Sequence, residues 1–353
     1  MKIRNCFQKL PVLSSLLLVL LTSFTSSEKT AKPVISIVTD KIQGVVYLHG
    51  IDKLTTVLHD KNITYEKVVS LKEAKGNLII VTGLSLGEGE AAEMLKSANH
   101  QVPQESEALT AWKTNFQNKT VWVISGFDDL GLMYGLLDVA DRISWSTDNK
   151  NLMSEVKEIT EKPDVKERAV SIYTMNRTYW ESRLYDEVYW ARYLDMLARD
   201  RFNSLVVIFG YENGGFLAPC YPYFFNVEGF PGVKMTGLTD EQQKRNLSAF
   251  NRLITMAHDR GIRLTAGIKD HIYRCGVQGG GIPGIKCAPD QPVDGLVLGL
   301  TADNLISYTK AALAKFVKVF PGIDGILFFI NDETGLKKGE LEGFATYFFR
   351  MIK

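Results

Sequence analysis

The feature that most constrains the fold is a regular alternation of apolar and amphipathic segments after Arg168. Short apolar runs, typical of strands buried on both faces, occupy 169–174, 204–209, 262–268 and 325–330. Between them, apolar residues recur at helical spacing over 186–199, 239–257 and 302–319. Strands that alternate with helices favour a mostly parallel sheet covered by those helices.

The ends of these predicted helices carry recognisable signals. Thr239 is followed three positions later by Gln242, which forms the pattern of a capping box. Gly261 lies where a glycine commonly ends a helix, and Pro321 stops the helix that begins near residue 302. These signals make four consecutive βα units the simplest interpretation of this half of the chain.

A closed (β/α) barrel needs eight such units and about 250 residues, whereas about 185 residues follow Arg168. The chain therefore forms either a smaller open α/β sheet or part of a barrel. We favour the second, because the last residues, 347–352, form an apolar helix face that nothing later in the sequence covers. The expected fold class is α/β: a small α/β accessory domain, then a partial TIM barrel of about four βα units, truncated at its C-terminus.

A second α/β pattern precedes the barrel units. Strand-like runs occupy 34–38, 44–48, 77–82 and 121–125, and helical patterns cover 84–99 and 128–143. The polar segment 146–167, which contains Pro163, is typical of an interdomain crossing. We expect an accessory domain at 28–145, a linker at 146–167 and the barrel units at 168–353.

The first 27 residues have the three parts of a secretory signal peptide. Lys2 and Arg4 form a basic start, an apolar stretch covers 10–21, and small polar residues fill 22–27. The apolar stretch is shorter than the about 20 residues that span a bilayer. The alternative is a short uncleaved anchor. We expect a secreted or periplasmic protein without stable membrane insertion once the signal is removed.

Charge and cysteine content exclude some functions. A formal net charge of +1 without a basic block argues against nucleic-acid binding. Beyond the signal, Cys220, Cys275 and Cys287 form no CxxC pair, and no His/Cys spacing suits zinc, so no metal or cofactor is expected. Cys275 and Cys287 could form a disulfide in an oxidising compartment or remain free thiols.

Polar and aromatic residues follow each predicted barrel strand, at the end where barrel active sites lie. Hydroxyl groups of sugars bind carboxylates, amides and arginines, and sugar rings stack on aromatic side chains. The candidate substrate-binding residues are Arg168, Asn176, Arg177, Tyr211, Glu212, Asn213, Asp270, His271 and Asn331. Arg168 precedes its strand, and a structural role is the alternative there. The expected ligand is an oligo- or polysaccharide.

Two acidic residues after the fourth strand are the candidate catalytic pair. Glycoside cleavage needs an acid that protonates the leaving oxygen and a second group that acts as nucleophile or activates water. Glu333 is the expected general acid, because a neighbouring ionised Asp332 raises the pKa of its carboxyl group. The alternative is a solvated loop after a strand.

Two stretches resemble β-hexosaminidases and α-glucuronidases. The run 126–137, GFDDLGLMYGLL, is similar to the end of the accessory domain that precedes their barrel, and Asn331-Asp332-Glu333 is similar to the Asp-Glu pair after their fourth strand. The resemblance implies a glycoside hydrolase with an arginine near the first strand that holds the sugar. The hexosaminidase His-x-Gly-Gly motif is absent before the acidic pair, so the resemblance implies the reaction class and not an acetamido sugar.

Two other functions compete with a hydrolase. A non-catalytic glycan-binding protein on the same scaffold would use the aromatic residues without the acid. A deacetylase or metal hydrolase would need a metal cluster, and the strand ends offer a single histidine, His271.

Overall fold

The structure is a computed structural model. It describes residues 34–41, 43–148, 151–172, 177–209, 220–269, 297–300 and 303–329, and two isolated positions, 342 and 346. The predicted signal peptide and the helix expected from residue 339 lie outside these residues.

Residues 34–161 form one part of the chain, called the first layer below. It is built on a six-stranded sheet with the order β2-β1-β3-β5-β4-β6. Strands β2, β1, β3 and β5 are parallel, whereas β4 runs antiparallel to both β5 and β6. Its strands are β1 Ile35–Thr39, β2 Tyr65–Val68, β3 Leu78–Leu84, β4 Leu109–Phe116, β5 Lys119–Gly126 and β6 Ile159–Glu161.

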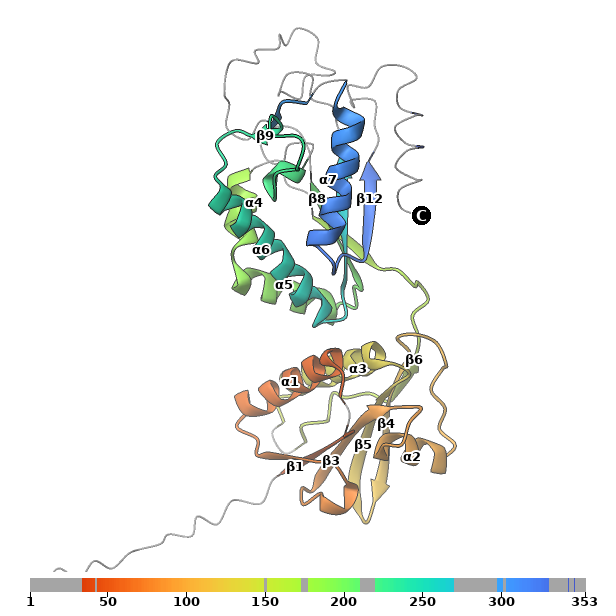
Figure 1. Cartoon of the computed structure of the whole chain (residues 1–353). Coiled ribbons are helices and arrows are strands. Elements are labelled where there is room, and N and C mark those ends of the chain that lie inside the picture. The colour runs from red at the N-terminus through yellow and green to blue at the C-terminus, as the bar shows by residue number, and fades with distance from the viewer. Residues whose placement is uncertain are drawn as a thin grey trace, which may run out of the picture. The chain divides into compact units, whose positions relative to one another are not determined.

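Helices cover both faces of this sheet (Figure 1). Side chains alternate along a strand, so Ile35 and Ile37 of β1 pack in one core and Val38 packs in the other. The first core also contains the apolar faces of α1 (Val45–Asp60) and α3 (Asp129–Trp145), and the second contains α2 (Glu90–Ser97). A short 3₁₀ helix, Leu71–Glu73, precedes β3.

The strand expected at 44–48 was wrong, because this segment begins helix α1. Val45 and Val46 favour a strand locally, but the wider pattern is helical. Tyr47, Ile51 and Leu54 recur at helical spacing and are all buried against the sheet. Burial of this stripe outweighs the weaker β-propensity of two residues.

Most of the segment expected as a linker belongs to the first layer. Residues 159–161 form β6, which pairs with β4, and Leu152, Met153 and Val156 are buried in the core that contains α1 and α3. Burial of these three apolar side chains and the pairing of β6 with β4 hold this polar stretch against the first sheet. The crossing between the sheets is therefore the short segment 162–168.

The second layer is a four-stranded, wholly parallel sheet with the order β7-β8-β10-β12. Its strands are β7 Ala169–Ile172, β8 Ser204–Phe209, β10 Arg263–Lys269 and β12 Gly325–Phe329. The helices between them are α4 Arg177–Leu184, α5 Glu187–Arg199, α6 Asp240–His258 and α7 Leu305–Val319. The expected strands and helices of this layer are confirmed in position within the described residues, while α4 was not expected. The first strand, β7, was expected to be buried, but it is exposed at Ala169 and Ser171. A 3₁₀ helix, Tyr221–Tyr223, and a small antiparallel pair, β9 Lys234–Met235 with β11 Val297–Leu298, complete it.

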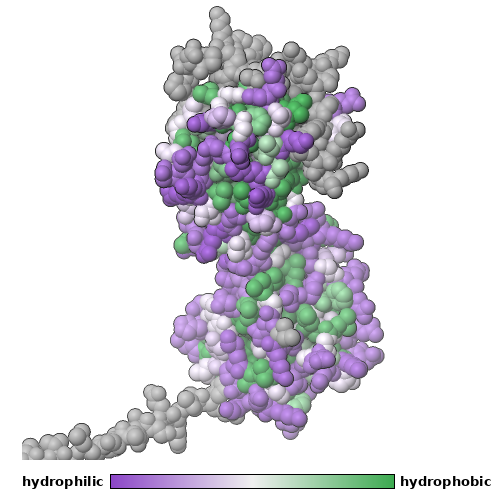
Figure 2. Space-filling model, viewed as in Figure 1, coloured by the Kyte–Doolittle hydropathy of each residue, from purple (hydrophilic) through white to green (hydrophobic). Residues whose placement is uncertain are grey.

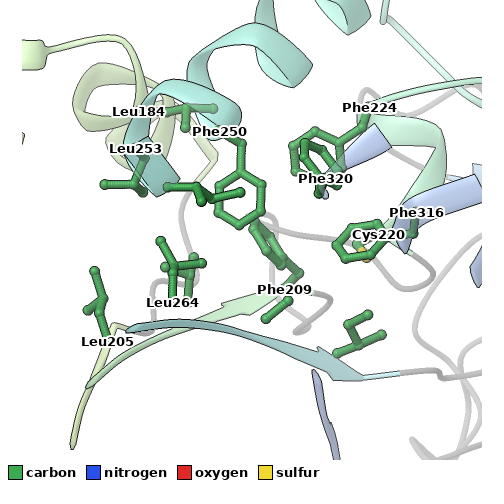
Figure 3. Close-up of a cluster of buried hydrophobic side chains, with 14 of the residues drawn as sticks. Leu184, Leu205, Phe209, Cys220, Phe224, Phe250, Leu253, Leu264, Phe316 and Phe320 are labelled. Carbon is green, nitrogen blue, oxygen red and sulfur yellow. The ribbon is translucent and has the colours of Figure 1, made fainter. Parts of the chain in front are cut away.

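Aromatic rings fill the space between this sheet and its helices (Figure 3). Phe250 of α6 lies at the centre, with ring centroids of Phe209 and Phe320 each 5.0 Å away. Full burial of such a side chain contributes about 1.5–3 kcal/mol. The predicted capping box at Thr239 is present: the Gln242 amide N–H donates to the Thr239 hydroxyl, and the Thr239 amide N–H donates to the Gln242 side chain.

Hydrophilic residues predominate on the face of the molecule drawn in Figure 2, with apolar residues in patches between them. None of the helices in the described part of the chain combines the length and apolar character that crossing a membrane requires.

Candidate functional site

The carboxyl ends of the four parallel strands lie at one edge of the second sheet. Near this edge Ile172 is in register with Val207, Phe209 with Ile268, and Lys269 with Phe329. Parallel register means that the chain leaves all four strands on the same side. In open and closed α/β sheets alike, ligands bind at this edge.

The predicted site residues follow these four strand ends, but the structure describes few of them. Arg177 begins α4, and its side chain lies outside the described atoms. The residues that lie outside the described part of the chain are Asn176, Tyr211, Glu212, Asn213, Asp270, His271, Asn331, Asp332 and Glu333. In the sequence, these residues follow strands that the structure shows to be parallel.

Helix α4 forms the described boundary of this edge, directly after the first strand end. Trp180 is buried, with edge-to-face contacts to Phe209 at 6.0 Å and Trp190 at 6.2 Å, so it belongs to the core. Tyr179 is 53% exposed, and the guanidinium of Arg183 lies over its ring at 4.7 Å. Of these two aromatic residues, Tyr179 is the one that can meet a ligand.

Arg168 lies at the opposite, amino-terminal edge. Its guanidinium pairs with the carboxylate of Glu107 and donates to the carbonyl oxygens of Arg201 and Val165, both at 2.6 Å. Its own backbone amide N–H donates to the Asn203 side chain at 2.9 Å. These contacts give Arg168 a structural role at the start of β7, away from the strand ends where the other candidates lie.

Glu107 is a buried acidic residue whose role the sequence did not reveal. Its side chain is 8% exposed, and besides Arg168 it accepts a hydrogen bond from Asn203 Nδ2 at 2.7 Å. Its partners stand 61 and 96 positions away along the chain, so no local pattern could identify it. The network joins the residues before β7 and β8 to the first layer.

A second charged cluster joins helix α1 to helix α5. Asp195 of α5 accepts hydrogen bonds from Lys53 and Arg260, both at 2.6 Å. Burial would raise the pKa of Asp195, but these two bonds outweigh it and hold the pKa below its ordinary value. Beside them, burial and the Arg260 cation lower the pKa of His49 to about 4, so this ring stays neutral at physiological pH.

The carboxyl edge of the first sheet is occupied by the chain's own carboxylates. Asp40, after β1, accepts the Leu84 amide N–H at 3.1 Å, and a Cβ at Gly89 would lie 1.8 Å from its Oδ1. Likewise, a Cβ at Gly44 would lie 1.7 Å from Oδ2 of Asp129. Two acidic groups thus lie at the starts of α2 and α1, where a bound anion would otherwise be placed. The first sheet therefore does not present the usual phosphate site.

Within the described residues, no group of three or more His, Cys, Asp or Glu side chains could hold a metal ion. Cys220 is a buried free thiol, and the possible pair Cys275 and Cys287 lies outside the described residues.

Comparison with known proteins identifies the architecture. No protein-family model matches the chain, and no curated protein does. Solved structures do: a GH138 enzyme targeting pectin rhamnogalacturonan II superposes on 91% of this chain with a TM-score of 0.64 and 18% identity. The chain shares its fold with glycoside hydrolases. The structure of CpGH84D matches 90% of it with a TM-score of 0.50 and 10% identity.

The chain spans less than half of these neighbours, covering 42% of the GH138 enzyme and 45% of CpGH84D. At 10–18% identity the likeness concerns the fold. Reaction and substrate depend on the residues of the site and not on the fold.

Proposed function

We propose that this chain is an exported glycoside hydrolase whose active site is at the carboxyl edge of the second sheet. The observation that carries the proposal is the parallel register of β7, β8, β10 and β12, each followed within two residues by a carboxylate, amide or aromatic residue. The fold shared with glycoside hydrolases, one of which targets a pectin, supports a carbohydrate substrate.

The second sheet is, in this proposal, part of a (β/α) barrel that further βα units close. Its strands follow one another in chain order, as they do around such a barrel. Leu327 of β12 is 44% exposed, and Ile306 and Val317 of α7 are each 49% exposed. Exposed apolar residues on the last described strand and helix are what a continuing ring would cover.

Glu333 is the proposed general acid and Asp332 its neighbour. Cleavage of a glycosidic bond leaves an alkoxide unless the departing oxygen is protonated as the bond breaks. The ionised Asp332 favours the protonated form of Glu333, which suits that role. Asn176, Arg177 and the other residues that follow the strands would bind the sugar hydroxyls.

The substitution Glu333→Gln in the full-length enzyme tests this role. Glutamine keeps the shape but cannot donate the proton, so cleavage of alkyl glycosides should fall by about 10²–10⁴-fold. Aryl glycosides whose phenol is acidic leave without this help and should lose much less. Sugar binding, measured by calorimetry, should remain nearly intact.

Glu187→Gln, a substitution on the exposed surface of α5, is the matched control and should leave both rates unchanged. Equal loss on both substrate types would make Glu333 a nucleophile or a structural residue. Full activity of the variant on both substrate types would remove Glu333 from the mechanism. Sugar binding by a wild-type enzyme that cleaves no glycoside would favour a glycan-binding protein. Export is tested separately, by sequencing the N-terminus of the mature protein, which should begin near residue 28.

A further inference from the structure

The first layer contains a hollow that the proposed active site does not use. Its volume is about 580 Å³, and it lies between the segment that follows β3, helix α2, the segment 100–104 and β6. The residues that line it are Ser85, Leu86, Gly87, Ala92, Leu95, Lys96, His100, Gln101, Val102, Pro103, Gln104 and Thr160.

The floor of the hollow is apolar and its wall is fixed. Leu95 and Val102 are buried beneath it, and Leu86, 57% exposed, stands at its rim. His100 is held by Nε2 contacts with the hydroxyls of Thr110 at 3.0 Å and Thr160 at 3.3 Å. A pre-formed concave site with an apolar floor and a few polar groups is typical of small-molecule binding.

The polar rim carries donors and a single fixed charge. Lys96, Gln101 and Gln104 are exposed there, and none of the described residues that line the hollow is acidic. Glu105, which follows Gln104, does not line the hollow and pairs with Lys162. A ligand that suits this rim offers acceptor oxygens and a negative charge.

We propose that this hollow is an accessory binding site for a carboxylated sugar, a uronate unit of a glycan. The C–H face of the sugar ring would lie on Leu86, Leu95 and Val102, and the carboxylate would pair with the Lys96 ammonium group. Neutral sugars usually bind through protein carboxylates that accept from their hydroxyls, and the described lining provides none. The inference rests on the proposed function only in taking glycans as the ligands.

Calorimetric titration of the mature chain at low salt tests the site, with trigalacturonate as the probe and its methyl ester as the uncharged analogue. Lys96→Gln should weaken trigalacturonate binding about three- to fivefold, the effect of one exposed charge pair. Binding of the ester should be weaker from the start and should not respond to this substitution. Leu86→Asp, which places a carboxylate in the hollow, should abolish trigalacturonate binding.

Lys72→Gln is the matched control, an exposed lysine of the same layer that does not line the hollow. Equal affinity in the Lys96 and Lys72 variants, equal binding of acid and ester, or no binding at all would overturn the inference. Measuring cleavage and trigalacturonate binding together in the wild-type full-length enzyme separates the two proposals. Lys96-dependent binding by an enzyme that cleaves no glycoside would sustain the site against the hydrolase, and cleavage without Lys96-dependent binding would do the reverse.

Discussion

The Glu107 network makes a quantitative prediction about stability. In Glu107→Gln the amide keeps one acceptor oxygen, so it can satisfy either Arg168 or Asn203 but not both. Breaking a buried ion pair costs about 3–5 kcal/mol when the remaining charge has no other partner. Arg168 retains two carbonyl acceptors and is 20% exposed, which reduces the penalty. The loss then approaches that of one charge-assisted hydrogen bond, about 2 kcal/mol.

Urea unfolding followed by tryptophan fluorescence and far-ultraviolet circular dichroism measures this change. Trp122 lies in the first layer and Trp190 in the second, so fluorescence reports on both. Glu161→Gln is the matched control: its pair with Arg201 is 2.6 Å long but more than a third exposed on each side, and its loss should cost less than about 1 kcal/mol. A Glu107→Gln variant within about 0.5 kcal/mol of the wild type would refute the reasoning.

Three further predictions follow from the same structure. Thr239→Ala removes the capping box and should lower the free energy of unfolding by about 1 kcal/mol in the same urea assay. Phe250→Ala, at a fully buried ring, should lower it by about 3–5 kcal/mol, and a loss below 1 kcal/mol would contradict the packing described. The lowered pKa of His49, about 4 in the folded state, means that the unfolded chain binds the extra proton first as pH falls. Stability should therefore decrease between about pH 6.5 and pH 4. His49→Leu should flatten this decrease, whereas His59→Leu, at an exposed site, should not.

Much of the second layer could be predicted from the sequence because its signals are local. The strand expected at 204–209 has those bounds in the structure, and the capping box at Thr239 forms between residues three positions apart. A buried parallel strand is a continuous apolar run, and its helix shows one apolar stripe. Neither signal depends on distant residues.

The first layer was harder to predict because distant partners determine its elements. Strand β4 mixes buried and solvent-facing residues and is stabilised by pairing with β5 and β6. Strand β6 has three residues and exists through its pairing with β4. Such short strands carry too little local propensity to be recognised before the sheet is known.

For the candidate site, the sequence predicted which residues follow the barrel strands. The register shows that these strands are parallel, so their carboxyl ends lie at one edge of the sheet. The roles of Asp332 and Glu333 remain predictions for the experiments above. Arg168 shows why position matters as much as residue type. An arginine beside a barrel strand suits a sugar, but this one precedes its strand and meets Glu107 at the other edge.

The pairing of β6 with β4 also sets an order of assembly as the chain emerges, N-terminus first. The six strands of the first sheet have all been made once residue 161 has emerged from the ribosome, before the first residue of β7 emerges. After that point, each new strand of the second sheet finds its neighbour already formed, because β7, β8, β10 and β12 are adjacent in the order in which they are made. Among the described strands, the second sheet therefore grows by addition at one edge, and in the proposed barrel only β7 would wait for a distant partner, the strand that closes the ring.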